Sequence, residues 1–177
     1  MNSTNRLFVV FLWVISSAVF SQEKLDVFNV ARNGTTEHLL SIVKSNPKEI
    51  NNINSDGYSP LILACYRGNN EVAKMLIENG ADINYKSALG SPLMACVVKN
   101  NNEIAKILIS KGANVNITDA NGMTAILYAT MFKNYEITRL LVKNKADIQA
   151  KDNRGNSALD YAILADDDTL IEILKTK

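Results

Sequence analysis

The chain repeats itself about every 33 residues, and this period constrains its fold more than any other feature. Four segments open with a Gly that is followed two or three residues later by Pro or Ala. These Pro or Ala residues lie 32, 33 and 33 residues apart and are Pro60, Pro92, Ala125 and Ala158. A unit of this size cannot bury its apolar face alone, so stacked neighbours must form the core. The period therefore predicts a solenoid.

Within each copy, the residue pattern predicts two helices and then an extended turn. Pro suits the first turn of a helix, because the N–H that it lacks has no partner there. Hydroxyl residues able to cap the first helix are Ser59, Thr124 and Ser157. Apolar residues at positions 72, 75 and 76, and again at 104, 107 and 108, predict a second helix with one buried stripe. Gly80 and Gly112 would end that helix.

One copy carries a specific set of residues: Ser59-Pro60-Leu61, Ala64, Gly68, Val72, Met75-Leu76 and Gly80-Ala81-Asp82-Ile83-Asn84. This set resembles the ankyrin repeat. Parts of it return in the later copies, and a more divergent copy lies near the N-terminus. The resemblance implies an all-α fold, an α-solenoid of about five helix-turn-helix repeats with β-hairpin tips. The predicted repeats span approximately residues 22–53, 54–86, 87–118, 119–151 and 152–177.

Several positions depart from the repeat pattern. The third repeat lacks one residue between Gly90 and Ser91, which predicts a shorter hairpin tip. Lys145 replaces the Gly that ends the second helix, so a strained or reshaped loop is expected there. Lys133 and Asp166 replace the Gly between the two helices.

The N-terminus has the pattern of a secretory signal peptide. Arg6 precedes an apolar run that ends at Ile15, and small residues then lead to a predicted cut after residue 21. A membrane anchor is the alternative, but the run is shorter than the roughly 20 residues needed to cross a bilayer. We expect residues 22–177 to form an exported domain, periplasmic in a bacterium or secreted. In a eukaryote, Asn33 and Asn116 would be glycosylation acceptors.

The charge of the chain excludes two classes of partner. The sequence holds 19 basic and 18 acidic residues without a basic block. Binding to nucleic acid or to an anionic membrane surface requires clustered positive charge. We therefore expect neither partner, and no membrane insertion after signal cleavage.

The two cysteines are predicted to be free thiols rather than a disulfide. Cys65 and Cys96 fall on the first helices of adjacent repeats. The resemblance places such helices about 10 Å apart, whereas a disulfide needs Cα atoms within about 7 Å. Both side chains are expected to be buried as small apolar groups.

No group of residues predicts catalysis, a metal site or a cofactor. His38, the one histidine, is expected on the solvent side of its helix without partners. The acidic run at 165–169 is interpreted as a helix cap at Asp168 or a neighbour, because calcium ligands at the required spacing do not follow. Nucleophile and phosphate-loop motifs are absent from the sequence, so we expect a protein that is not an enzyme.

The resemblance implies a binding face formed by hairpin tips and the exposed ends of first helices. Transferred position by position, the residues predicted to contact a partner are Tyr58, Tyr66, Arg67, Leu89, Met123, Met131, Phe132 and Arg154. Aromatic residues, Met and Arg are enriched at the centres of interfaces. The alternative is that some of these side chains pack across repeat junctions. For Phe132, either a partner covers the ring or Lys133 reshapes the loop and turns it inward.

Two functions follow as expectations. The first is a monomeric, non-catalytic scaffold that binds another protein outside the cytoplasm. The alternative is a periplasmic helper in oxidative-stress defence that supports catalase activity, based on similarity in layout to small periplasmic ankyrin proteins. The two differ in whether loss of the gene changes survival under peroxide.

Overall fold

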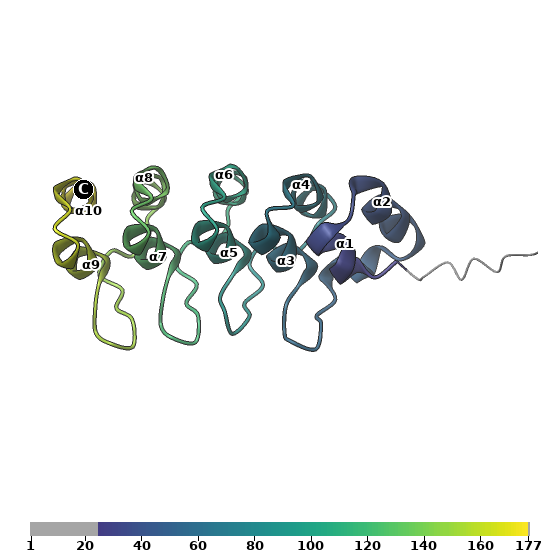
Figure 1. Cartoon of the computed structure of the whole chain (residues 1–177), viewed down its shortest axis with the longest axis horizontal. Coiled ribbons are helices and arrows are strands. Elements are labelled where there is room, and N and C mark those ends of the chain that lie inside the picture. The colour runs from purple at the N-terminus through teal and green to yellow at the C-terminus, as the bar shows by residue number, and fades with distance from the viewer. Residues whose placement is uncertain (1–24, 177) are drawn as a thin grey trace, which may run out of the picture.

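The computed structural model describes residues 25–176, which form a single row of stacked helix pairs (Figure 1). The predicted signal segment, residues 1–21, lies outside the described residues. The elements, in chain order, are α1 (Val27–Asn33), α2 (Thr36–Ser45), the 3-10 helix η1 (Pro47–Asn51), α3 (Pro60–Arg67), α4 (Asn70–Glu78), α5 (Pro92–Val98), α6 (Asn102–Ser110), α7 (Ala125–Met131), α8 (Tyr135–Lys143), α9 (Ala158–Leu164) and α10 (Asp168–Lys175).

The helix pairs stack in parallel layers, and each pair is one repeat (Figure 1). The first helices α1, α3, α5, α7 and α9 lie in one row, and the second helices α2, α4, α6, α8 and α10 lie in another. The main helix contacts join the two helices of a repeat or the same helices of adjacent repeats. The all-α solenoid of about five repeats is therefore confirmed.

Between the repeats, four loops project from the side of the first helices that faces away from the second helices (Figure 1). We call their ends the tips, residues 54–58, 87–90, 119–123 and 152–156, and number each by the repeat whose first helix follows it. The predicted β-hairpins are minimal here, because within residues 25–176 the only β-pairing is one isolated bridge between Ser87 and Gly90.

The first helices begin as the sequence predicts, with one exception. The Ser59 hydroxyl accepts from the Ile62 N–H at 3.3 Å, and Ser157 forms a reciprocal capping box with Asp160. Thr124 stands at the same position before α7, but its side chain forms no capping bond. Its buried hydroxyl has no hydrogen-bond partner, so the prediction that Thr124 caps the helix through its side chain is wrong.

The core runs along the array between the two rows of helices. Leu76, Leu108 and Leu141 occupy the same position of successive second helices and are fully buried. Cys65 and Cys96 are also fully buried, as separate thiols. Burial, together with contact with Cys65, raises the pKa of the Cys96 thiol.

The turns between helices keep one shape although their residues differ. Gly68 has φ +73°, and the residues at the same position of the next repeats, Asn100, Lys133 and Asp166, have φ +54°, +53° and +51°. Lys145 likewise has φ +63°, where the two preceding repeats have Gly. Side chains disfavour this left-handed region, so the expected strain at Lys145 is present and the backbone path is conserved.

Asparagine side chains fix the spacing between repeats one to four. The Oδ1 atoms of Asn51, Asn84 and Asn116 each accept from a backbone N–H of the following repeat at 2.8 Å. The donors are the residues two positions after each helix-ending Gly or Lys, namely Asp82, Asn114 and Asp147. Each bond satisfies a loop N–H and sets how far one repeat lies from the next.

No helix within residues 25–176 has both the length and the apolar character needed to span a lipid bilayer.

Candidate functional site

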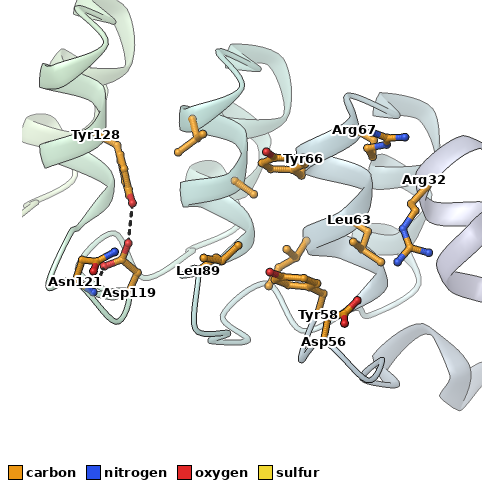
Figure 2. Close-up of a pocket in the computed structure, with 13 residues that line it drawn as sticks. Arg32, Asp56, Tyr58, Leu63, Tyr66, Arg67, Leu89, Asp119, Asn121 and Tyr128 are labelled. Carbon is orange, nitrogen blue, oxygen red and sulfur yellow. Dashed lines mark hydrogen bonds between the residues drawn. The ribbon is translucent and has the colours of Figure 1, made fainter.

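A groove of about 610 Å³ lies between the first helices and the tips of the middle repeats (Figure 2). Its floor and walls come from four successive repeats. The lining residues are Arg32 of repeat one; Asp56, Tyr58, Ile62, Leu63, Tyr66 and Arg67 of repeat two; Leu89, Ala95 and Val98 of repeat three; and Asp119, Asn121 and Tyr128 of repeat four.

Small side chains on α5 create the depression. Ala95 occupies the position that holds Leu63 in the preceding repeat and Tyr128 in the following one. One turn further along the helix, Val98 stands where its neighbours have Tyr66 and Met131. The larger residues on both sides therefore form walls, while repeat three contributes a low floor.

The tip of repeat three is also shorter, as the missing residue predicts. Its closing hydrogen bond joins the Ser87 N–H to the Gly90 carbonyl at 3.0 Å, spanning three positions. The corresponding bond in repeat four joins the Asp119 N–H to the Met123 carbonyl at 2.9 Å and spans four. The shorter loop leaves Leu89 exposed at the edge of the groove.

The tips are joined to one another, which makes the groove wall continuous. The Ala120 N–H donates to the Ala88 carbonyl at 3.0 Å, and the Asn153 N–H donates to the Asn121 carbonyl at 2.9 Å. The Tyr85 side chain, just before the tip of repeat three, reaches back to the tip of repeat two, where its hydroxyl donates to the Gly57 carbonyl at 3.0 Å. A partner would therefore meet a wall whose neighbouring loops are fixed to each other.

Tyr128 and Asp119 form the wall at the repeat-four end (Figure 2). The Tyr128 hydroxyl donates to the Asp119 carboxylate at 2.7 Å, which also accepts from the N–H groups of Asn121 and Met123. Burial, together with this carboxylate, raises the pKa of Tyr128 to about 12. Tyr161 and Asp152 repeat the arrangement in repeat five, where the Tyr161 bond lowers the pKa of Asp152.

Positive charge collects at the ends of the first helices near the opposite wall. Arg32 and Arg67 line the groove there (Figure 2). The Lys99 ammonium lies 4.8 Å from the centre of the Tyr66 ring, which is a cation–π distance. Asp56, on the tip of repeat two, is the carboxylate on this side of the groove.

The structure brings half of the predicted contact residues together. Tyr58, Tyr66, Arg67 and Leu89 all line the groove. Met131 and Phe132 lie exposed on the next repeat, outside the lining, and Arg154 is exposed on the tip of repeat five. The exposed fractions of the large apolar members are 45% for Tyr66, 60% for Leu89, 44% for Met131 and 51% for Phe132.

Met123 is not at the surface, which contradicts its prediction as a contact residue. Only 6% of its area is exposed. Its N–H donates to the Asp119 side chain and its carbonyl accepts from the Asp119 N–H, so the backbone is held where the tip closes onto α7. The thioether side chain consequently joins the core.

Phe132 remains exposed, and the alternative that Lys133 turns it inward is wrong. Lys133 adopts the same left-handed turn as Gly68, so the loop is not reshaped. The Phe132 ring instead stacks on Tyr128, with ring centres 6.1 Å apart and planes 4° from parallel. One face of the ring is covered by the protein itself, and much of the remainder is open to a partner.

Sequence reasoning missed Ala95, Asp119 and Tyr128 as parts of the site. Tyr128 is half-buried and forms a wall. The available signal was the series Leu63, Ala95 and Tyr128 at one repeat position, together with the missing tip residue. A small residue between two large ones indicates a depression, whereas a search for large exposed residues finds only its walls.

The residues considered for chemistry occupy structural positions. His38 is exposed on α2. Asp167, beside the predicted Asp168, caps α10 by accepting from the Leu170 N–H at 3.1 Å, and this bond lowers the pKa of its carboxyl. Within residues 25–176, no three His, Cys, Asp or Glu side chains gather closely enough to hold a metal ion.

Comparison with known proteins agrees with this architecture. A family model described as ankyrin repeats in three copies matches residues 27–119 and 93–177. Residues of this chain are 38% identical over 71 positions to the BTB/POZ domain-containing protein 3 of Schizosaccharomyces pombe, covering 38% of this chain and 14% of that protein. They are 32% identical over 63 positions to the ankyrin repeat and SAM domain-containing protein 6 of Danio rerio, covering 36% and 8%.

A third similar protein is the protein fem-1 homolog A-like of Mus musculus, 30% identical over 78 positions, covering 44% of this chain and 12% of that protein. The chain thus spans less than a sixth of the length of these curated relatives.

Proposed function

Because the chain belongs to the ankyrin repeat family, whose repeats generally mediate protein–protein interactions, we propose that it is a non-catalytic scaffold that binds another protein. The binding surface is the groove together with the exposed side chains beside it. We call this combined surface the groove face, defined by the groove lining plus Met131 and Phe132.

The observation that carries this proposal is the gathering of large exposed apolar side chains on one face. Tyr66 and Leu89 lie at the groove, and Met131 and Phe132 continue the same surface onto repeat four. Covering a Phe or Met side chain is worth roughly 1.5–3 kcal/mol. Contiguous apolar surface on a protein of this size usually marks an interaction site.

The proposed setting is outside the cytoplasm. Its support is the sequence of residues 1–21 alone, with a charged start, an apolar run and small residues before the predicted cut. Expression of the full chain followed by N-terminal sequencing of the exported product tests this part. A product that begins near Gln22 is expected, and a full-length product retained inside the cell would contradict it.

Capture of partners from an extract of the native cells tests the scaffold function. We compare the wild-type chain with a double variant, Tyr66→Ala with Phe132→Glu, which removes one aromatic side chain and places a charge on the other exposed position. Loss of the proteins specifically captured by the wild type is expected, because both substitutions alter large exposed side chains of the groove face.

A matched control places the same charge elsewhere. Leu40 on α2 is a large apolar residue with 41% of its area exposed, and it lies outside the groove face. The Leu40→Glu variant should capture the same proteins as the wild type. Equal capture by the double variant at an unchanged melting temperature would contradict the proposal.

A further inference from the structure

The groove has an apolar part and a positively charged part, and together they restrict the type of partner segment that it can bind. Its apolar depression lies over Ala95 and Val98, between the walls of Tyr66 and Tyr128. Its positive charges lie toward the repeat-one end, where Arg32 and Arg67 contribute to the lining. The apolar and the charged parts are therefore neighbouring subsites along one channel.

The two arginines have little of their charge satisfied by the protein. Among residues 25–176, the Arg67 side chain forms no hydrogen bond or ion pair, and Arg32 donates to one neutral oxygen, the Oδ1 of Asn29, at 3.3 Å. Lys99 adds a third cation beside Tyr66. The helix dipole stabilises cations at the C-terminal ends of helices only weakly. It leaves the N–H groups of the arginines free to bind carboxylates.

The carboxylates of the groove do not cancel this charge. Asp119 lies at the opposite end, where it already accepts from the Tyr128 hydroxyl and from two backbone N–H groups. Asp56 lies on the tip of repeat two, on the same side of the groove as the arginines, and forms no ion pair with a residue in the described range. Three cations therefore face one available anion near the repeat-two wall.

The length of the groove favours a chain over a compact ligand. Its lining extends from α1 to α7, across three inter-repeat spacings. With helix spacings of about 8–10 Å, the groove is roughly 25–30 Å long. An extended peptide advances about 3.3 Å per residue, so roughly eight residues would fill it.

We propose that the groove binds an extended acidic segment of the partner protein, in which a large apolar side chain enters the depression over Ala95 and neighbouring Asp or Glu carboxylates meet Arg67 and Arg32. This inference rests on the proposed function and specifies the partner segment. The apolar contact supplies burial, and the arginines fix the direction in which the segment lies. Oppositely charged surfaces also speed association and discriminate against partners of the wrong charge.

Selection from displayed short peptides of random sequence, with the full chain as bait, tests the inference. Enriched peptides should combine a large apolar residue with nearby Asp or Glu. In fluorescence polarisation, replacing those acids by Asn or Gln in the best peptide should weaken binding at least about tenfold. Added salt should weaken binding of the original acidic peptide and should have less effect on the Asn or Gln version. No enrichment, or enrichment without acidic residues, would overturn the inference.

Two variants test whether the selected peptide binds in the groove. Ala95→Tyr copies the residue of the next repeat and fills the depression, so the selected peptide should lose at least about tenfold in affinity. Arg67→Glu leaves the depression open and reverses one charge, so a repeated selection should shift from acidic toward basic peptides. Because Arg67 is exposed, this second variant remains informative if Ala95→Tyr fails to fold.

Arg139→Glu on α8 is the matched control for charge, because Arg139 is exposed on the second helices away from the groove. It should bind the selected peptide like the wild type. Unchanged peptide binding by folded Ala95→Tyr and Arg67→Glu would overturn the groove assignment. If those variants also capture native partners normally while the Tyr66 and Phe132 double variant does not, the scaffold function stands and only this inference fails.

Discussion

Repeats three and four have the same helix arrangement and equivalent buried residues, but the surface is lowered at repeat three and raised at repeat four. Repeat three has Ala95 and Val98 on its first helix and a short tip, and these lower the surface into a groove. Repeat four has Tyr128 stacked on Phe132 beside exposed Met131, and these raise it. The difference shows that surface relief in this array depends on a few first-helix positions and on tip length, while the buried positions of both repeats remain alike.

The largest expected change in stability tests whether the buried positions of repeats three and four are equivalent. Leu108 and Leu141 occupy the same position of α6 and α8, and both are fully buried. Leu108→Ala and Leu141→Ala should each lower the free energy of unfolding by about 2–5 kcal/mol, with similar values measured by urea denaturation. Leu40→Ala on the surface should have little effect. Clearly unequal losses at 108 and 141 would break the comparison.

A smaller effect is expected from the hydroxyl that repeat four has and repeat three lacks. Tyr128→Phe removes the bond to Asp119 and should cost about 1 kcal/mol near neutral pH. Tyr66→Phe is the matched control, since the Tyr66 hydroxyl forms no hydrogen bond within residues 25–176. Equal stability of the two variants would show that the Asp119 contact contributes nothing.

The same variant has a signature at alkaline pH. The pKa of Tyr128 is raised to about 12 in the folded chain, against about 10 for an unfolded tyrosine. Between these values the unfolded state releases its proton first, so the contribution of Tyr128 to stability is complete below pH 10 and is lost as the pH rises toward 12. Tyr128→Phe should make the decline in unfolding free energy less steep over this range, measured by denaturation at successive pH values.

The smallest effect distinguishes the two left-handed turns. Lys133 and Asn100 occupy the same turn with nearly equal φ, but Asn tolerates this region better than Lys. Lys133→Gly should raise the unfolding free energy by about 0.5–1 kcal/mol. Asn100→Gly should give no such gain, because it also removes the bond in which the Asn100 Oδ1 accepts from the Asn134 side chain at 2.9 Å. The contact of the half-exposed Lys133 ammonium with the buried Asp167 carboxylate is long, at 3.5 Å, and should be too weak to reverse the sign. Equal gains at both positions, measured by thermal unfolding, would contradict this account.

Much of the fold could be predicted from the sequence because its signals are local and repeated. The Pro and Ala spacing, the second-helix apolar stripe and Gly68 each recur or are replaced at a fixed interval. The missing residue after Gly90 correctly predicts the short tip. Local patterns of this kind identify elements and their order before any tertiary contact is known.

The site was less predictable because it depends on how side chains from different repeats meet. Met is a residue type that is enriched in interfaces, yet the closure of the repeat-four tip places Met123 in the core. Ala95 draws no attention as a single residue, and its role follows from the height of Tyr66 and Tyr128 on either side. A depression is a difference between neighbours, so the search for large exposed side chains finds its edges and misses its floor.

The asparagine bonds from Asn51, Asn84 and Asn116 have a consequence for the order of folding. Each ties a repeat to its immediate successor, and the main helix contacts do the same. Contacts between close neighbours in the chain favour rapid folding, and an array of this kind can nucleate at any adjacent pair and grow in both directions. Repeat five lies beyond the last of these bonds and is held to repeat four by other contacts, since the Tyr135 hydroxyl donates to Asp167 at 2.9 Å and the Asn153 N–H donates to the Asn121 carbonyl at 2.9 Å.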